Sequence, residues 1–209
     1  MTDSNSPIDD FNQKYIKRTG FYLGELNKKG EDIIIGEFIN INKTRDLSFS
    51  KSKKPIIFNF NNQITGDTIL LKFEKNTNKI DSLIVFNNAF ILENDTLGTG
   101  FNQISGKSLL GKFIDDELKS IDIIKNAESI YYLRNDENEL ISIDKSKSAK
   151  LKIYFKLNEI EKIQKINQID GKTYPEDKFT DKLKLLKGFN NRLNEKILSI
   201  EELFKQNKN

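Results

Sequence analysis

The segment Asn62–Phe73 reads NQITGDTILLKF, and the segment Asn102–Phe113 repeats it as NQISGKSLLGKF. Most of the aligned positions are identical, and the two copies start 40 residues apart (102 minus 62). A period of this length is typical of repeating architectures, in which each unit buries its apolar face against its neighbours. The duplication therefore predicts a stacked scaffold, and it draws attention to the surface that this scaffold encloses.

Within both copies the apolar residues recur at every second position, which is the pattern of a strand with one buried face. The stretch Leu151–Phe155 shows the same alternation a third time. A polar turn and a second apolar stretch follow each strand, and in the first two copies this stretch ends at Asn88-Ala89 and Asn126-Ala127. The sequence thus predicts a meander of β-hairpins with roughly ten residues per strand, as in a sandwich, a jelly roll or a solenoid.

The alternating apolar residues are expected to line one interior. Two interpretations of that interior stay open: a dry core filled by its own side chains, or a groove open along one side that acyl chains complete. In the second case each buried CH2 group would stabilise the complex by about 0.8 kcal/mol. The groove candidates are Ile69, Leu71, Phe73, Ile80, Leu83, Val85, Leu109, Phe113, Ile121, Ile123, Leu151, Ile153, Phe155, Ile160 and Ile163.

Composition narrows the class of function. The 209 residues include 34 basic and 31 acidic side chains, which are interspersed and leave a net charge of only +3, so no basic stripe for nucleic acid is present. The chain has no Cys and no His, which excludes thiol nucleophiles, Cys/His zinc sites and His-based triads. Acidic pairs such as Asp115-Asp116 and Glu159/Glu161 lie beside predicted turns, and nothing distinguishes one of them as a glycosidase site. We therefore expect a protein that is not an enzyme and uses no cofactor.

Three further features admit both a functional and a structural interpretation. Gly66 and Gly106 could let a ligand approach the backbone, but a bend or bulge at a strand start, where glycine tolerates positive φ, is favoured. Tyr131-Tyr132 could stack on a sugar, although a strand more often places one such ring in the core and the other outside it. The basic run Lys51–Lys54 is favoured as a solvated loop over a phosphate contact.

Three regions are expected along the chain. Residues 1–20 predict a disordered or linker N-terminus, residues 21–170 predict a repeat-built β-jelly roll, and residues 171–209 predict a C-terminal tail or cap. Within the tail, Lys182–Leu186 predicts a short helix, and Ser199–Glu202 has the spacing of a capping box. No apolar run reaches the roughly 18 residues of a membrane-spanning helix.

Several short blocks follow one another at characteristic spacings. They are Asp95–Phe113, Asn126–Tyr132, Asn138–Ile141, Lys145-Ser146, Asn158–Ile160, Gly171–Pro175, Gly188-Phe189 with Arg192, and Glu202–Phe204. Together they resemble the OstA-like proteins of Bacteroidetes, which are relatives of the lipopolysaccharide-transport protein LptA. The likeness extends over roughly residues 55–204. Two positions depart from the family pattern, since Asn191 stands in place of Trp and Ile197 in place of Pro.

The resemblance implies a fold and a function. The implied fold is an elongated, twisted or V-shaped β-jelly roll of stacked antiparallel strands, with an acyl-binding groove inside and a short, partly helical C-terminal tail. The implied function is non-enzymatic periplasmic lipid transport, in which lipopolysaccharide acyl chains are bound on the bridge to the outer membrane. Met1–Pro7 carries no secretory signal, so the resemblance also implies that this chain is the C-terminal part of a longer protein or has a truncated start.

The expected partners follow from the same resemblance. Lipopolysaccharide is the expected ligand, and other Lpt components are expected to pair with edge strands, because an unpaired edge is a template for another strand. Head-to-tail self-association is expected by the same route, and no nucleic-acid partner is expected. The alternative is a structural or interaction β-module that pairs with protein partners through its edge strands.

Overall fold

The computed structural model describes residues 20–23, 32–36, 38–41, 47–50, 55–59, 62–74, 79–115, 117–156 and 159–196, and the structural statements below concern these residues. The predicted N-terminal linker falls almost wholly outside them. The basic run Lys51–Lys54 and the capping box Ser199–Glu202 also lie outside the described residues.

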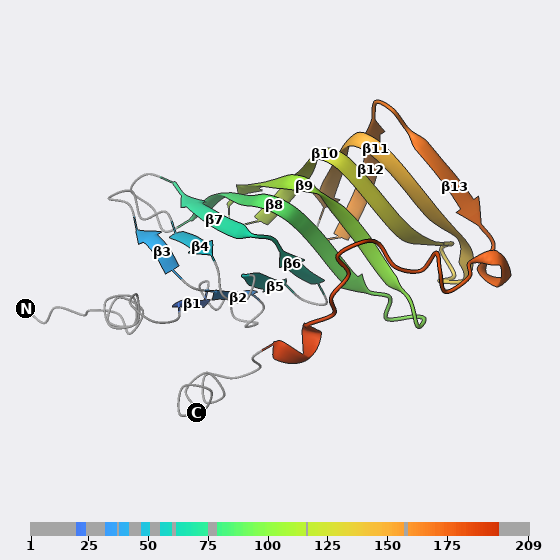
Figure 1. The fold of residues 1–209 in the computed structure, drawn as a ribbon, viewed down its shortest axis with the longest axis horizontal. Coiled ribbons are helices and arrows are strands. Elements are labelled where there is room, and N and C mark those ends of the chain that lie inside the picture. The colour runs from blue at the N-terminus through green and yellow to red at the C-terminus, as the bar shows by residue number, and fades with distance from the viewer. Residues whose placement is uncertain are drawn as a thin grey trace, which may run out of the picture.

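Thirteen strands form one antiparallel sheet within this part of the chain. The first strands lie at one end of the molecule, and β11, β12 and β13 lie at the other (Figure 1). The bounds are β1 Gly20–Leu23, β2 Asp32–Gly36, β3 Phe38–Ile41, β4 Leu47–Ser50, β5 Ile56–Asn59, β6 Asn62–Thr65, β7 Thr68–Phe73, β8 Ile80–Asn94, β9 Phe101–Ile114, β10 Glu117–Arg134, β11 Leu140–Lys156, β12 Glu159–Ile166 and β13 Asp170–Tyr174.

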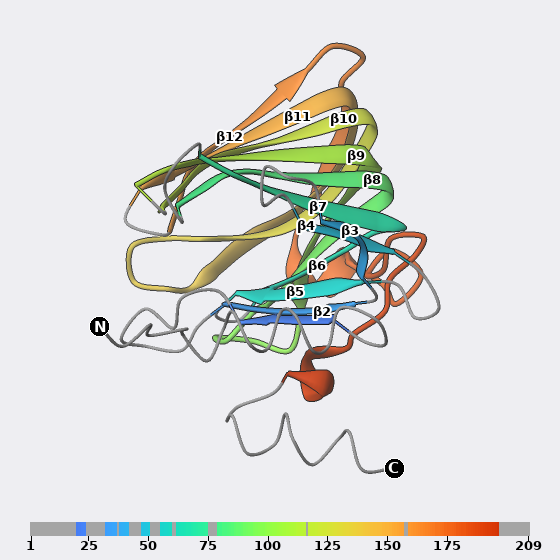
Figure 2. The same ribbon diagram turned by 90° about the vertical axis from the view of Figure 1, so that its left-hand side faces the viewer.

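Strand order largely follows the chain, as β1-β2-β5-β6-β8-β9-β10-β11-β12. β8 pairs with β6 along one half of its length and with β7 along the other, and β11 pairs with β13 and β12 in the same way. Seen from the end, the strands stack one below another without closing into a barrel (Figure 2). Helix among the described residues is limited to the 3-10 turns η1 Glu176–Lys178 and η2 Leu193–Glu195. The predicted jelly roll of stacked antiparallel strands, with a short and partly helical tail, is confirmed.

The long strands bend near their middles. Two consecutive residues have positive φ in β8, Asn87 (56°) and Asn88 (50°), and again in β10, Lys125 (64°) and Asn126 (53°). The pairing register shifts at these positions, which identifies β-bulges that bend and twist the sheet. We call the row of bulges the bend line. It divides the sheet into a near half, which contains β7 and β12, and a far half, which contains β6 and β13.

Gly66 and Gly106 lie against the bulges of the neighbouring strands. A Cβ atom on Gly66 would come 2.1 Å from Val85 Cγ1, and one on Gly106 would come 2.3 Å from Ile123 Cγ2. Gly188 is the only described glycine with positive φ, so neither of these two needs glycine for its backbone angle. The bulge predicted from the sequence is present, but close approach of the next strand, and not positive φ, requires glycine here.

The strands are longer than the sequence predicts. The stretches expected to end at Asn88-Ala89 and Asn126-Ala127 continue to Asn94 in β8 and to Arg134 in β10. Strand pairing resumes beyond each bulge, so the polar residues at the bend interrupt the ladder without ending the strand.

The sheet buries two clusters of apolar side chains. The larger lies in the interior of the near half, and the smaller lies between the far half and residues 175–196, which we call the strap. The strap leaves β13 and runs back across the strands of the far half (Figure 1). The helix predicted at Lys182–Leu186 is not formed. The carbonyl of Lys184 and the amide of Leu186 are bonded to Gln103 on the sheet, and residues 181–184 form turns instead.

Candidate functional site

The strand register arranges the groove candidates in three rows that cross the near half. The first row lies next to the bend line and crosses five neighbouring strands, β7 to β11, as Ile69, Val85, Leu109, Ile123 and Leu151. These side chains are at most 1% exposed. Directly opposed residues on one face of a sheet lie about 5 Å apart. The first row is therefore a continuous wall of aliphatic side chains.

The second row lies one step further from the bend line. Gly111 takes the place of a side chain on β9, and a Cβ there would lie 3.4 Å from both Leu83 Cβ and Leu118 Cδ1, so neighbouring side chains fill the gap. All members of the row are buried except Ile163, which is partly buried. The row consists of Leu71, Leu83, Gly111, Ile121, Ile153 and Ile163.

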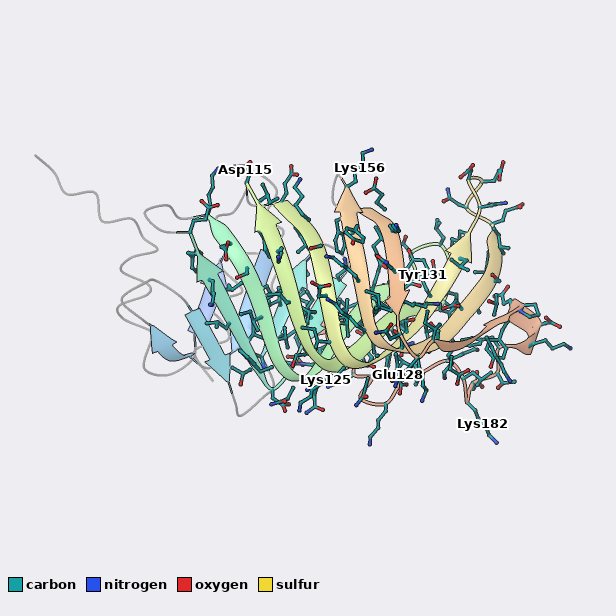
Figure 3. All side chains as sticks on the ribbon, turned by 90° about the horizontal axis from the view of Figure 1, so that it is seen from above. Asp115, Lys125, Glu128, Tyr131, Lys156 and Lys182 are labelled. Atoms are coloured by element: carbon teal, nitrogen blue, oxygen red, sulfur yellow. The ribbon has the colours of Figure 1, made fainter. Side chains whose placement is uncertain are left out.

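The third row lies at the strand ends and is only partly buried, and we call it the rim. Its residues lie at strand ends along one edge of the sheet, where Figure 3 labels Asp115 and Lys156 at separate hairpin ends. Rim side chains pack against the buried cluster and keep part of their surface exposed. The rim consists of Phe73, Ile80, Phe113, Leu118, Phe155 and Ile160.

All fifteen predicted groove residues thus belong to one cluster, and their burial increases from the rim to the bend line. The cluster also contains Leu118 and extends past the bend line to Ile64 and Ile104, which the sequence analysis missed. Ile104 shows why. At the β8 bulge two residues of β8 oppose one residue of β9, and the alternation along β9 is inverted there, so that Ile104 and Leu109 share the interior although one number is even and the other odd. Gly106 between them was the available sequence signal.

Beyond the bend line the interior becomes polar toward β10 and β11. The hydroxyls of Ser129 and Ser146 lie 3.0 Å apart, and Ser146 donates to Asp144 Oδ1 at 2.9 Å. Lys165 Nζ on β12 donates to the same carboxylate oxygen at 2.5 Å. The interior therefore combines an aliphatic near half with a far half that is apolar at Ile64 and Ile104 and hydrogen-bonding toward β10 and β11.

The two adjacent tyrosines lie on opposite faces of β10. Tyr132 packs edge-on against Phe179 of the strap, with ring centroids 6.2 Å apart. Tyr131 therefore points to the interior face, because side chains alternate along a strand; Figure 3 labels it on the far half. Burial raises the pKa of the Tyr131 phenol, and the Glu93 carboxylate raises it further. The two rings lie on opposite faces, as the favoured interpretation requires, but neither is outside the core in the sense of being exposed, because both are partly buried.

Two cavities flank the strap, and none of the fifteen groove candidates lines either of them. One cavity, of about 360 Å³, lies at Tyr132 and Arg134, where Arg134 Nη2 donates to Asp95 Oδ2 at 2.6 Å. The other, of about 530 Å³, lies beside Phe90 and Gly188. Both are spaces beside the docked strap, separate from the apolar interior.

Of the acidic pairs considered in the sequence, the structure describes the side chains of Asp115 and Glu161, and both are exposed. Asp115 lies in an exposed hairpin turn and forms an ion pair with Lys79 at 2.6 Å, and the hydrogen bond from Lys79 lowers the pKa of this carboxyl. Asp116 and the side chain of Glu159 lie outside the described residues. In the described part of the chain, no group of three acidic side chains is placed to hold a metal ion. Over the same residues, no helix has the length and apolar character needed to cross a membrane.

Comparison with known proteins gives a structural likeness only. No protein-family model matches the sequence, and no curated protein matches it. The fold is similar to the crystal structure of LptH from Pseudomonas aeruginosa, described as the LptA-homologous periplasmic component of the conserved lipopolysaccharide transport device. The likeness covers 69% of this chain and 95% of that chain, with 11% sequence identity and a TM-score of 0.48.

Proposed function

We propose that this protein is a non-enzymatic periplasmic lipid-transport module that binds the acyl chains of lipopolysaccharide in its near half, as part of a bridge to the outer membrane. The sequence resemblance to OstA-like proteins supplies the ligand class. The observation that carries the proposal is the graded burial of the three rows, which leads from a partly exposed rim into an aliphatic interior.

The rim is the point at which an acyl chain would enter. Apart from Gly111, the first row and the β7 to β11 members of the second are at most 3% exposed, so their side chains fill the interior between them. An acyl chain must therefore part the rim side chains instead of entering an empty channel. Each CH2 group that it buries contributes about 0.8 kcal/mol, so several chains on one lipid give firm binding without a charged anchor.

End-to-end association through edge strands belongs to the same proposal. Among the described strands, β12 pairs with β11 alone and ends the main strand order, while β1 ends it on the other side. Unpaired backbone groups on such strands can accept another strand. Other Lpt components and a second copy of this chain are the partners that this geometry can accommodate.

Site-specific photocrosslinking in intact cells tests the lipid proposal. A photoreactive phenylalanine analogue replaces Phe113 in the full chain, which is exported to the periplasm behind a signal peptide. We expect a lipopolysaccharide adduct at Phe113 on the rim. The matched control replaces the adjacent Lys112, which is exposed on the opposite face of β9, and should give no adduct.

Absence of adducts at Phe113, Phe73 and Phe155 in a folded protein would reject the lipid proposal and assign the cluster to an ordinary core. Protein adducts in place of lipid adducts would then favour an interaction module. Circular dichroism of each purified variant establishes that the sheet is intact.

A further inference from the structure

The duplicated glutamines of the sequence repeat make the same pair of hydrogen bonds to the strap. Gln103 Nε2 donates to the carbonyl of Lys184 at 2.7 Å, and Gln103 Oε1 accepts from the amide of Leu186 at 2.9 Å. Gln63 Nε2 donates to the carbonyl of Asn190 at 2.7 Å, and Gln63 Oε1 accepts from the amide of Arg192 at 2.8 Å. Each side-chain amide therefore acts like the peptide group of a neighbouring strand. It binds the carbonyl of one strap residue and the amide two residues later.

Both glutamines are buried, at 1% exposed for Gln63 and 0% for Gln103. A buried side-chain amide that lost these partners would leave a donor and an acceptor unsatisfied. Neither glutamine touches the apolar interior of the near half, because both belong to the face that the strap covers. Their repetition in the sequence is thus explained by the strap and not by the groove.

The two glutamines belong to a single row of residues that crosses the sheet from strand to strand. The register pairs Gln63 with Leu92, Leu92 with Gln103, Gln103 with Ile130, and Ile130 with Lys145. Lys145 is the third member of the series, because it precedes Leu151 by six residues, as Gln103 precedes Leu109. Lys145 Nζ donates to the carbonyl of Leu183 at 2.7 Å. We call Gln63, Gln103 and Lys145 the clamp row. The aliphatic Leu92 and Ile130 lie between its members.

The strap is shaped to fit this spacing. Gln63 and Gln103 lie two strands apart, or about 9.6 Å, whereas six fully extended residues would span about 20 Å. A turn takes up the difference. Gly188 has a φ of +92°, and the amide of Phe189 donates to the carbonyl of Leu186 at 3.1 Å. The two strap residues whose amides donate to the glutamines are buried: Leu186 is 5% exposed and Arg192 is 9% exposed.

We propose that the clamp row is a peptide-binding site that recognises the main chain of a strap-like segment, and that the strap occupies it as a ligand held in cis. The same site takes the strap of a second copy of this chain in trans. A second copy is the favoured occupant because it supplies the same turn and the same spacing. The first residues of the strap, 175–178, are exposed and lie beyond the end of β13, so the rest of the strap can leave without disturbing a strand.

The clamp row recognises the backbone of the strap. Five hydrogen bonds join the clamp row to strap carbonyls and amides, and none of them involves a strap side chain. Sequence requirements on the ligand are a residue with positive φ at position 188, and apolar residues at positions 179 and 186 to reach the cluster formed with Phe90 and Ile143. This proposal is independent of lipid binding.

Strap exchange in the otherwise complete chain tests the proposal. A site for a sequence-specific protease is inserted between the exposed residues Asp177 and Lys178, and the folded protein is cleaved. A fluorescent peptide of residues 178–196 is then added, and its binding is followed by anisotropy. We expect the peptide to replace the cleaved strap while the circular dichroism of the sheet stays unchanged. A peptide carrying Gly188→Ala should bind about tenfold more weakly, because alanine is strained at this φ.

Two outcomes would overturn the proposal. In one, the sheet unfolds when the cleaved strap is removed, which would make the strap an integral part of the core. In the other, the strap leaves and the peptide does not rebind.

Hydrogen exchange in the uncleaved chain provides a second measurement. Gln103→Met keeps the shape of the side chain and removes both bonds. It should speed exchange of the Leu186 amide about tenfold or more and leave the amides of Ile121 and Ile123 unchanged. Gln63→Met should act in the same way on the Arg192 amide. Uniform acceleration across the sheet would instead mean that the clamps support the whole fold and not a separable ligand.

Discussion

Gly106 lies where the bulge of β10 comes closest to β9. A Cβ atom at this position would be 2.3 Å from Ile123 Cγ2 and 3.3 Å from the carbonyl oxygen of Lys125. Ile123 is fully buried in the first row and has no free space to enter. The repeat thus places a glycine where β9 passes close to the bulge of the neighbouring strand. The sequence alone could show only that a small residue recurs at this position.

Gly106→Ala should lower the free energy of unfolding by about 1–3 kcal/mol, the usual cost of inserting a group into a packed core. Chemical denaturation followed by circular dichroism measures this change. The adjacent substitution Lys107→Ala serves as the control, because Lys107 is exposed, and should change stability by less than about 0.5 kcal/mol. Equal effects of the two substitutions would show that the contact at Gly106 is relieved by a small backbone shift.

At the scale of the elements, hairpins and their apolar alternation could be predicted from the sequence, and the length of the strands could not. Within β7 every second side chain lies on the interior face, as the sequence predicts for Ile69, Leu71 and Phe73. The alternation was not a reliable guide in β9, where the register shift opposite the β8 bulge lies between Ile104 and Leu109. The sequence predicted a C-terminal tail or cap but not the path of the strap, because that path depends on hydrogen bonds to residues far away in sequence.

The bulge of β10 should respond to the backbone preference of its residues. Asn126 is exposed and has a φ of 53°, a conformation that β-branched residues strongly disfavour. Asn126→Val should therefore cost about 1–2 kcal/mol of unfolding free energy, as measured by urea denaturation. Asn126→Gly should cost much less, since glycine adopts this angle freely. A similar loss for both variants would indicate that the Asn126 side chain, and not its backbone angle, supports the bend.

At the scale of the whole molecule, the sheet offers edge strands at both ends. The all-β class was predictable because three alternating stretches and their turns favour a sandwich, a jelly roll or a solenoid, and the family resemblance implied the jelly roll. The identity of the edge strands required the structure, since β12 and β13 share β11 as a neighbour in a way that no local pattern reveals.

The absence of cysteine makes end-to-end pairing directly testable. Gln164→Cys places a thiol on an exposed position of β12, and Tyr22→Cys places one on β1. If copies associate head to tail, oxidation of the double variant should give a ladder of disulfide-linked oligomers in non-reducing electrophoresis. Each single variant should yield at most a dimer. A double variant that stays monomeric at high protein concentration would contradict pairing between these edges.

The bend line has a consequence for how such a protein can change in size. The bulges lie at the same place in successive hairpins. Each hairpin therefore has the same bent cross-section, whatever the number of hairpins in the stack. Inserting or deleting one hairpin would change the length by two strand spacings, or about 9.6 Å, and leave the profile unaltered. The length of the molecule can therefore change by one hairpin at a time, through duplication or loss of the coding segment for that hairpin.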